Sequence, residues 1–329
     1  MRIKRILAVL ALASSAIVTC AAAAPDATQR GAASADKIRG EEHWVTRDGL
    51  KIYLWEKRAD PNRRHAQGVI LLVHGGTWSG RPDFDLQIRD YSLMDFLATH
   101  GFDVWAIDIH GYGHSDKTDK DWSEPGSAAA DLATAADYIT RASGFTVIDV
   151  LGWSAGTQRV GLFAMLHPEK VRRLVLYAPH WKGTSEYQAA VKKRIENGGV
   201  PLTQFRVNTE ADARSDFVRG DLAQDPQFEE DVVRMYAAEA LKTDPRSPNA
   251  FVANATGPIL DPLRITVPTL IIHGERDYAA QQEDLLPFFQ ALKTNDKSYV
   301  LLPGGGHAIM LEKQHRMFQH EILSFLERP

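Results

Sequence analysis

A serine flanked by two glycines is the first feature of this sequence that could do chemistry. Gly152-Trp153-Ser154-Ala155-Gly156 follows the strand-like apolar run 147–151 and leads into a helix-like stretch over 157–167. A strand that turns sharply into a helix with serine at its tip is typical of a nucleophile elbow, whose glycines let the two elements approach closely. The N–H of Ala155 is then expected to face the oxyanion that forms when Ser154 attacks a carbonyl.

A serine nucleophile needs a base, and the base needs a carboxylate to orient it. The sequence offers both, each just beyond a later strand-like run: Asp277 after 269–272, and His307 after 298–302. Glu275 competes with Asp277, which could instead simply cap the next helix. We favour Asp277 because it lies further past the strand and can turn inward. Three glycines precede His307, which predicts unusual backbone dihedrals that aim its ring.

A second oxyanion donor is expected in the loop after the first buried strand, over 69–73. That loop reads His74-Gly75-Gly76-Thr77-Trp78, and the backbone N–H of either Gly76 or Thr77 could serve. We expect His74 to hold this loop by hydrogen bonding rather than to act as a base. Aromatic and histidine side chains that could contact a substrate are Trp78, Trp153, His180, Trp181 and Tyr187.

The elements that must position these residues alternate between strand and helix. Such alternation predicts an α/β fold with a mostly parallel central sheet covered by helices on both faces. Two early strands, 43–45 and 50–55, are joined by the hairpin signal Arg47-Asp48-Gly49. The alternation lapses over 179–267, which we predict to be a helical lid or cap inserted between core segments 41–178 and 268–329. A separate small domain without a substrate role is the alternative.

The N-terminus predicts export. A basic start, an apolar run and the small residues Ala21-Ala22-Ala23 indicate a signal peptide over 1–23, followed by a flexible leader over 24–40. The mature protein would then be periplasmic or secreted, without a membrane span. A retained membrane anchor, or a lipoprotein acylated on Cys20, are the alternatives. Cys20 is the only cysteine, so neither a disulfide framework nor a thiol nucleophile is expected in the mature chain.

Charge and motifs exclude several other classes. The net charge of −4 and the lack of a basic stripe argue against nucleic acid as a partner. We expect no cofactor, because neither a phosphate-cradling loop nor a dinucleotide fingerprint is present. We also expect no metal, because His110 and His114 lie in a glycine-rich loop without a matching carboxylate.

Taken together, the motifs resemble those of the α/β-hydrolase superfamily over nearly all of the chain except the leader and the lid. Besides the segments already quoted, residues 108–115 (Asp-Ile-His-Gly-Tyr-Gly-His-Ser) are similar to that family's Asp-x-x-Gly-x-Gly-x-Ser loop, which supports the rim of the site. The resemblance implies the chain order Ser154, Asp277, His307 for the catalytic residues. A serine at 154 departs from the aspartate nucleophile of the dehalogenase and epoxide-hydrolase branches.

These observations predict a secreted, carboxylesterase-like serine hydrolase that cleaves a small-molecule carboxylic ester through an acyl-enzyme on Ser154. Amide or peptide hydrolysis of the aminopeptidase type, lactone hydrolysis and acyl transfer would use the same three residues, and fold resemblance does not separate them. A non-catalytic binding protein is the alternative from a different class. The oligomeric state stays open.

Overall fold

The computed structural model describes residues 38–60, 62, 65–118, 125–179, 193, 196–197, 205–249 and 260–329. The predicted signal peptide, most of the predicted leader, and the candidate contacts His180, Trp181 and Tyr187 lie outside the described residues. Within the part of the chain that is described, no helix combines the length and the apolar character that crossing a membrane requires.

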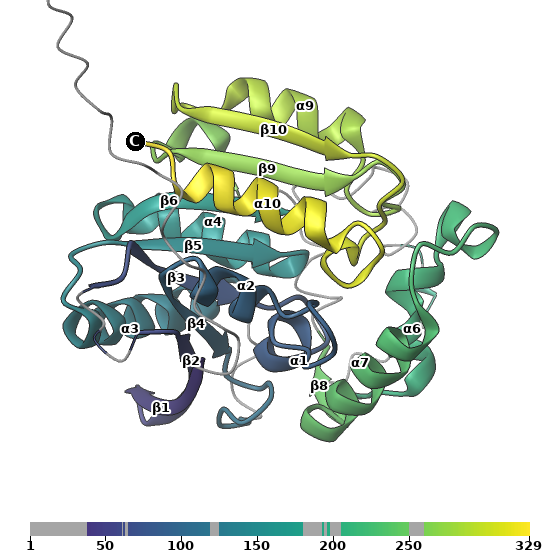
Figure 1. Ribbon diagram of the computed structural model, residues 1–329, viewed down its shortest axis with the longest axis horizontal. Coiled ribbons are helices and arrows are strands. Elements are labelled where there is room, and N and C mark those ends of the chain that lie inside the picture. Colours follow the sequence, from purple (N-terminus) through teal and green to yellow (C-terminus); the bar gives the residue numbers. More distant parts are fainter. Residues whose placement is uncertain are drawn as a thin grey trace, which may run out of the picture. The chain divides into compact units, whose positions relative to one another are not determined.

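A central sheet organises the described residues (Figure 1). Its strands lie in the order β1-β2-β4-β3-β5-β6-β9-β10. The strand bounds are β1 Arg39–Arg47, β2 Leu50–Arg58, β3 Gly68–Val73, β4 Phe102–Asp108, β5 Ile148–Trp153, β6 Val171–Tyr177, β9 Thr269–Gly274 and β10 Lys297–Leu302. All neighbours from β4 to β10 pair in parallel, whereas β1 and β2 are antiparallel. The predicted α/β fold is therefore confirmed.

The inner strands are apolar because both faces of the sheet are covered. Every residue of β3, β4, β5 and β9 is buried, which explains their continuous hydrophobic runs. The helix bounds in the core are α1 Gly80–Phe84, α2 Leu93–Thr99, α3 Pro125–Ser143, α4 Ala155–Leu166, α9 Gln282–Ala291 and α10 His315–Leu326. Helices α3 and α4 pack together against one face, and α2 and α10 pack together against the other (Figure 1).

Local signals explain where several elements begin and turn. Ser92 caps α2 by accepting a hydrogen bond from the N–H of Asp95. The turn between β1 and β2 places Asp48 and Gly49 at φ 49° and 86°, the left-handed region that suits a tight hairpin. Strand β1 begins at Arg39, so the last two residues of the predicted leader belong to the sheet, where they pair with β2.

The insertion contributes two helices and a small hairpin. In its described part, α6 Glu210–Val218 and α7 Glu230–Thr243 pack on each other, and β7 Phe205–Val207 pairs with β8 Arg246–Pro248. Short 3₁₀ helices are η3 Pro168–Lys170, η4 Gly220–Ala223, η5 Pro262–Arg264 and η6 Ile309–Leu311. Helix α7 also contacts α1, directly after the loop that holds Gly76 and Thr77, so the insertion touches the core beside the candidate site.

Candidate active site

Ser154 lies at a strained turn between β5 and α4. Its φ of 53° and ψ of −120° place a non-glycine residue at positive φ, which costs on the order of 1–3 kcal/mol. The turn persists because its surroundings hold it. The Ser154 N–H donates to the carbonyl of Tyr177 on β6, and the Thr157 side chain and N–H both donate to the Ser154 carbonyl.

The two glycines of the elbow are required by space. A Cβ at Gly152 would lie 2.4 Å from the carbonyl oxygen of Gly156, and a Cβ at Gly156 would lie 2.4 Å from that of Val73. Neither glycine has a positive φ, so close backbone approach, and not dihedral freedom, selects glycine at both positions.

Ser154, His307 and Asp277 form a continuous hydrogen-bonded chain, although they are far apart in the sequence. The Oγ of Ser154 lies 3.0 Å from Nε2 of His307. Both carboxylate oxygens of Asp277 lie 2.9 Å from Nδ1 of His307. An ionised carboxylate only accepts hydrogen bonds, so Nδ1 carries the proton and Nε2 is left free to accept from the serine hydroxyl.

Burial and partners set the charges of this pair. Burial raises the pKa of Asp277. The charge and hydrogen bond of His307 and the N–H groups of Ala279 and Ala280 lower that pKa by more, so the net pKa is below the ordinary value. Burial lowers the pKa of His307, but the charge and hydrogen bond of Asp277 raise it by more, so the pKa of His307 is above its ordinary value. Asp277 is thus ionised and stabilises a protonated imidazole, and it also caps the following turn.

The glycine loop before His307 is selected mainly by close packing. Only Gly304 adopts a positive φ, of 70°. A Cβ at Gly305 would lie 2.0 Å from Ile309, and one at Gly306 would lie 2.3 Å from Leu222. The expected unusual backbone dihedral occurs at Gly304, whereas at Gly305 and Gly306 the side chains of Ile309 and Leu222 leave little room for a Cβ.

The loop 74–78 is held from several sides. The N–H of Gly75 donates to Asp83, the hydroxyl of Tyr112 donates to the Gly76 carbonyl, and Arg159 donates to the Gly75 carbonyl. Asp83 is buried, which raises the pKa of its carboxyl well above the ordinary value, against the hydrogen bonds from Gly75 and Tyr236. These contacts fix the backbone of the segment in which Gly76 and Thr77 were predicted as alternative oxyanion donors.

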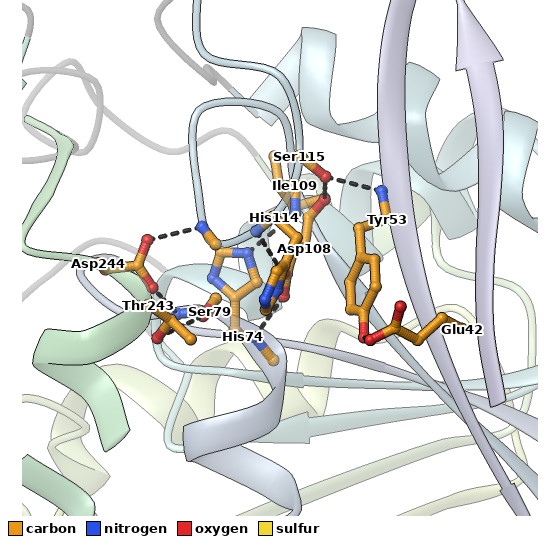
Figure 2. A network of polar contacts seen from close by, with 12 residues as sticks. Glu42, Tyr53, His74, Ser79, Asp108, Ile109, His114, Ser115, Thr243 and Asp244 are labelled. Carbon is orange, nitrogen blue, oxygen red and sulfur yellow. Dashed lines mark hydrogen bonds and ion pairs between the residues drawn. The ribbon is translucent and has the colours of Figure 1, made fainter. Parts of the chain in front are cut away.

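His74 supports the same loop, as the sequence predicts. Its Nδ1 lies 2.9 Å from the Gly75 carbonyl, and its Nε2 accepts from the N–H of Ile109 (Figure 2). Burial and the nearby Arg159 lower its pKa to about 3. The ring is therefore neutral, with a fixed tautomer, and acts as a bridge between two loops.

A cavity of about 110 Å³ opens beside Ser154. The core lines it with both glycines and Thr77 of the loop, Ala155, His307, Trp78 and Trp153. The insertion adds Arg206, Asp212, Ser215, Asp216, Arg219, Pro248 and Asn249. The chemical groups needed for acyl transfer thus meet at one surface: a hydroxyl, a base oriented by a carboxylate, and a helix N-terminus. Among the described residues, the structure places both predicted core contacts, Trp78 and Trp153, at this cavity.

Residues 64–314 match the family described as Serine aminopeptidase, S33. The chain belongs to this family. It is a hydrolase of the α/β-hydrolase superfamily, as its motifs suggested.

Individual relatives of this S33 chain are distant. The serine hydrolase BPHL of Homo sapiens is 24% identical over 247 residues, 74% of each chain. Among solved structures, a membrane phospholipase A described as a novel bacterial virulence factor has 23% identity and a TM-score of 0.63, covering 90% of this chain and 87% of that one. An esterase from Exiguobacterium antarcticum has 16% identity and a TM-score of 0.66, covering 88% and 100%. Structural likeness at this level of identity establishes the fold.

Several residues that build this S33 site escaped the sequence analysis. Glu312 is buried and accepts a hydrogen bond of 2.6 Å from the N–H of Gly306, which fixes the loop before His307. Trp153, which the sequence analysis named only as a substrate contact, also donates from its indole to the His307 carbonyl and so orients that residue. An acid five positions after the histidine is a weak signal for Glu312. Asp83 and Arg159 carry no local signal, because their partners lie far away in the sequence.

A cluster away from the site offers ligand atoms for a metal. One atom each from Glu41, His43 and Glu56 lie within 4.8 Å of one another on β1 and β2. However, Arg58 pairs with both carboxylates, and Nε2 of His43 lies 2.8 Å from Glu56. The cluster therefore already has its counter-charge from a side chain of the same hairpin.

Proposed function

We propose that this protein is a serine hydrolase that cleaves a small-molecule carboxylic ester through an acyl-enzyme on Ser154. The observation that supports the proposal is the contact chain from Ser154 Oγ through His307 to Asp277, with distances of 3.0 Å and 2.9 Å. A neutral imidazole within hydrogen-bond distance of a serine at an elbow is the arrangement that turns a hydroxyl into a nucleophile.

Acylation follows from these contacts. Ser154 Oγ attacks the ester carbonyl while His307 Nε2 accepts its proton, and ionised Asp277 stabilises the resulting imidazolium. The carbonyl oxygen becomes an oxyanion that accepts hydrogen bonds from the N–H of Ala155 and from that of Gly76 or Thr77. Each donor lowers the barrier by about 3–4 kcal/mol. His307 then returns the proton to the departing alkoxide, which leaves as an alcohol.

Deacylation repeats these steps with water. His307 takes a proton from a water molecule, whose oxygen attacks the acyl carbon of the ester on Ser154. The tetrahedral intermediate collapses, Ser154 leaves with the proton from His307, and a carboxylic acid is released.

The decisive test replaces Ser154 with alanine. We expect Ser154→Ala to lower kcat for an aryl ester on the order of 10⁶-fold without changing the circular dichroism spectrum. A fluorophosphonate probe should label the unchanged protein and not the variant. Retained turnover in the variant would defeat the assignment of Ser154.

Amide hydrolysis is the second candidate, because the matching family is described as a serine aminopeptidase. The same three residues would act on an amide, with His307 protonating a departing amine. A panel of aryl esters, amino-acid anilides and lactones separates the two candidates, and product analysis with added alcohols detects acyl transfer. We expect the aryl ester to have the highest kcat/KM of the panel.

We also propose that residues 1–23 direct export. The basic start and apolar run of that segment support this proposal. Cell fractionation with mass spectrometry of the mature N-terminus would test it. An unprocessed protein that stays in the cytoplasm would contradict it.

A further inference from the structure

Asp244 joins the lid to the core through two backbone N–H groups. It follows the last residue of α7 and is fully buried. One carboxylate oxygen accepts a 2.9 Å hydrogen bond from Ser79, and the other accepts a 2.6 Å hydrogen bond from Gly113 (Figure 2). Both donors belong to the core, so one lid side chain bridges two core loops.

One of these two loops contains the proposed oxyanion donors, and the other supports it. Ser79 directly follows the segment 75–78, which contains Gly76 and Thr77. Gly113 directly follows Tyr112, whose hydroxyl donates to the Gly76 carbonyl at 2.9 Å. Asp244 therefore fixes the end of the donor loop and also the loop that supports it.

Asp108 provides the same bridge from inside the core. Its two oxygens accept from the N–H of Gly80 and the N–H of His114, the residues next to Ser79 and Gly113 (Figure 2). The packing between the two carboxylates is tight, because a Cβ on Gly113 would lie 2.1 Å from Asp108 and 2.7 Å from Ser79. The two loops are thus held between one carboxylate of the core and one of the lid.

The charge of Asp244 and its surrounding contacts suit a bridge between the two loops. Burial raises its pKa to about 6, with a contribution from Asp108, against the hydrogen bonds from Gly113 and Ser79 and the charge of Lys117. It is ionised at neutral pH, so both oxygens are acceptors. Asn208 of the lid donates to the Asp244 carbonyl at 2.8 Å, and Thr243 accepts from the hydroxyl of Ser79 at 3.3 Å.

We propose that Asp244 is a positioning residue of the active site, through which the docked lid sets the place of the oxyanion donors at Gly76 and Thr77. The proposal rests on the proposed hydrolase function. It assigns the lid a part in stabilising the transition state, beyond covering the substrate. Donors that are displaced by a fraction of an ångström lose part of their effect on the reaction rate.

The test replaces Asp244 with asparagine. Asparagine keeps the size but offers one acceptor atom, and its NH₂ group faces a backbone N–H, so one of the two bridges is lost. We expect Asp244→Asn to lower kcat by about tenfold with little change in KM, less than the 10²–10³-fold that removal of a donor causes. The affinity for a boronic acid, whose tetrahedral adduct with Ser154 needs the same donors, should fall in proportion.

Asp149→Asn is the matched control. Asp149 is also a buried aspartate, paired with Arg172 at the start of β5, the end of the strand opposite Ser154. We expect this variant to lose stability while keeping kcat and boronic acid affinity. A loss of kcat in both variants, in proportion to the loss of stability, would overturn the positioning role of Asp244.

Hydrogen–deuterium exchange separates failure of this inference from failure of the proposed function. We expect peptides covering 75–80 and 109–115 to exchange faster in Asp244→Asn, and not in Asp149→Asn, whether or not the protein is an esterase. Unchanged exchange there, or faster exchange with unchanged kcat in an active protein, would overturn the inference. Lack of ester turnover and of fluorophosphonate labelling in the unchanged protein would instead defeat the proposed function. If Asp244→Asn does not fold, Asp244→Ser serves with the same measurements.

Discussion

The edge of the sheet and the insertion, which we propose to be a lid, line the same cavity but are built differently. At the sheet edge, Asp277 and His307 are only 3% and 2% exposed, and Asp277 also accepts from the backbone N–H groups of Ala279 and Ala280. In the lid, the ion pair of Arg206 and Asp212 has side chains that are 34% and 31% exposed. An exposed ion pair contributes about 0–1 kcal/mol, whereas loss of a partner from a buried pair costs several.

This difference indicates how the proposed roles are divided between catalysis at the sheet edge and substrate contact in the insertion. The core holds the proposed reacting groups by close backbone packing, as at the elbow glycines Gly152 and Gly156. The insertion presents partly exposed polar side chains such as Arg206 and Asp212 at the cavity, whereas Asp244, where it meets the core, is buried. Substitutions at the sheet edge are therefore expected to change kcat or stability, and most substitutions in the lid are expected to change KM.

After Ser154→Ala, the largest effect is expected at Asp277. Asp277→Asn leaves the imidazole in the wrong tautomer and should lower kcat/KM for an aryl ester by about 10⁴-fold. Glu275→Gln is the control, because Glu275 accepts from the N–H of Gly304 at the protein surface and glutamine can still accept. An effect of Glu275→Gln as large as that of Asp277→Asn would mean that the sheet edge uses another acid.

A stability test at the elbow comes next. Gly156→Ala would bring a Cβ within 2.4 Å and 2.6 Å of the carbonyl oxygens of Val73 and His74, which are backbone atoms. We expect the free energy of unfolding in urea to fall by about 3 kcal/mol. Gly126→Ala is the control, because that helical glycine has nothing within 4 Å of its Cβ position and should gain about 0.5 kcal/mol. Equal effects at both glycines would contradict the account of the rigid core.

The pH profile probes the charge balance of the sheet edge. His307 must be neutral to act as a base, and its pKa is raised above 6.5 by Asp277 with a contribution from Asp216, against burial and Arg219. We therefore expect kcat/KM to fall about tenfold per pH unit below a midpoint that lies above pH 6.5.

Burial raises the pKa of Glu312 to about 7, so it titrates in the same range. Glu312→Gln keeps an acceptor for Gly306 and removes that titration. A midpoint at or below 6.5 in this variant would show that Asp277 does not raise the pKa of His307.

The smallest effect is expected where the lid meets the core through Tyr278. Its hydroxyl donates to Asp216 and accepts from Arg219, and its ring centroid lies 5.3 Å from that of His307. Tyr278→Phe should raise KM by about fivefold and leave kcat unchanged. Tyr299→Phe removes a hydroxyl bound to His273 instead and should leave KM unchanged. A fall in kcat on Tyr278→Phe would break the division of work between core and lid.

The sequence predicts the core well because its signals are local. The hairpin signal Arg47-Asp48-Gly49 joins β1 to β2, and Ser154, Asp277 and His307 meet as expected. Apolar runs, caps and glycine loops act over a few residues. The parallel order of the strands then brings the loops that follow them to one edge of the sheet. The close packing of Gly306 against Leu222 is not visible in the sequence, because the two residues lie far apart along the chain.

The contacts between the proposed lid and the core could not be predicted from the sequence, for a related reason. Asp244 lies 165 positions from Ser79, and Asp83 lies 153 positions from Tyr236, whose hydroxyl donates to it. A buried carboxylate that finds backbone N–H groups across such a distance leaves no periodic pattern. The residues that hold the donor loop therefore emerge only from the structure.

The direction of the parallel strands has a practical consequence for handling the protein. Ser154 follows the end of β5, while the start of β6 lies at the opposite edge, where Arg173 donates to the carbonyl of Arg328 (Figure 1). A tether attached after Pro329 would therefore leave the molecule on the side away from the cavity. Protein immobilised on beads in this way should present its cavity to the solution and keep the turnover of the free form.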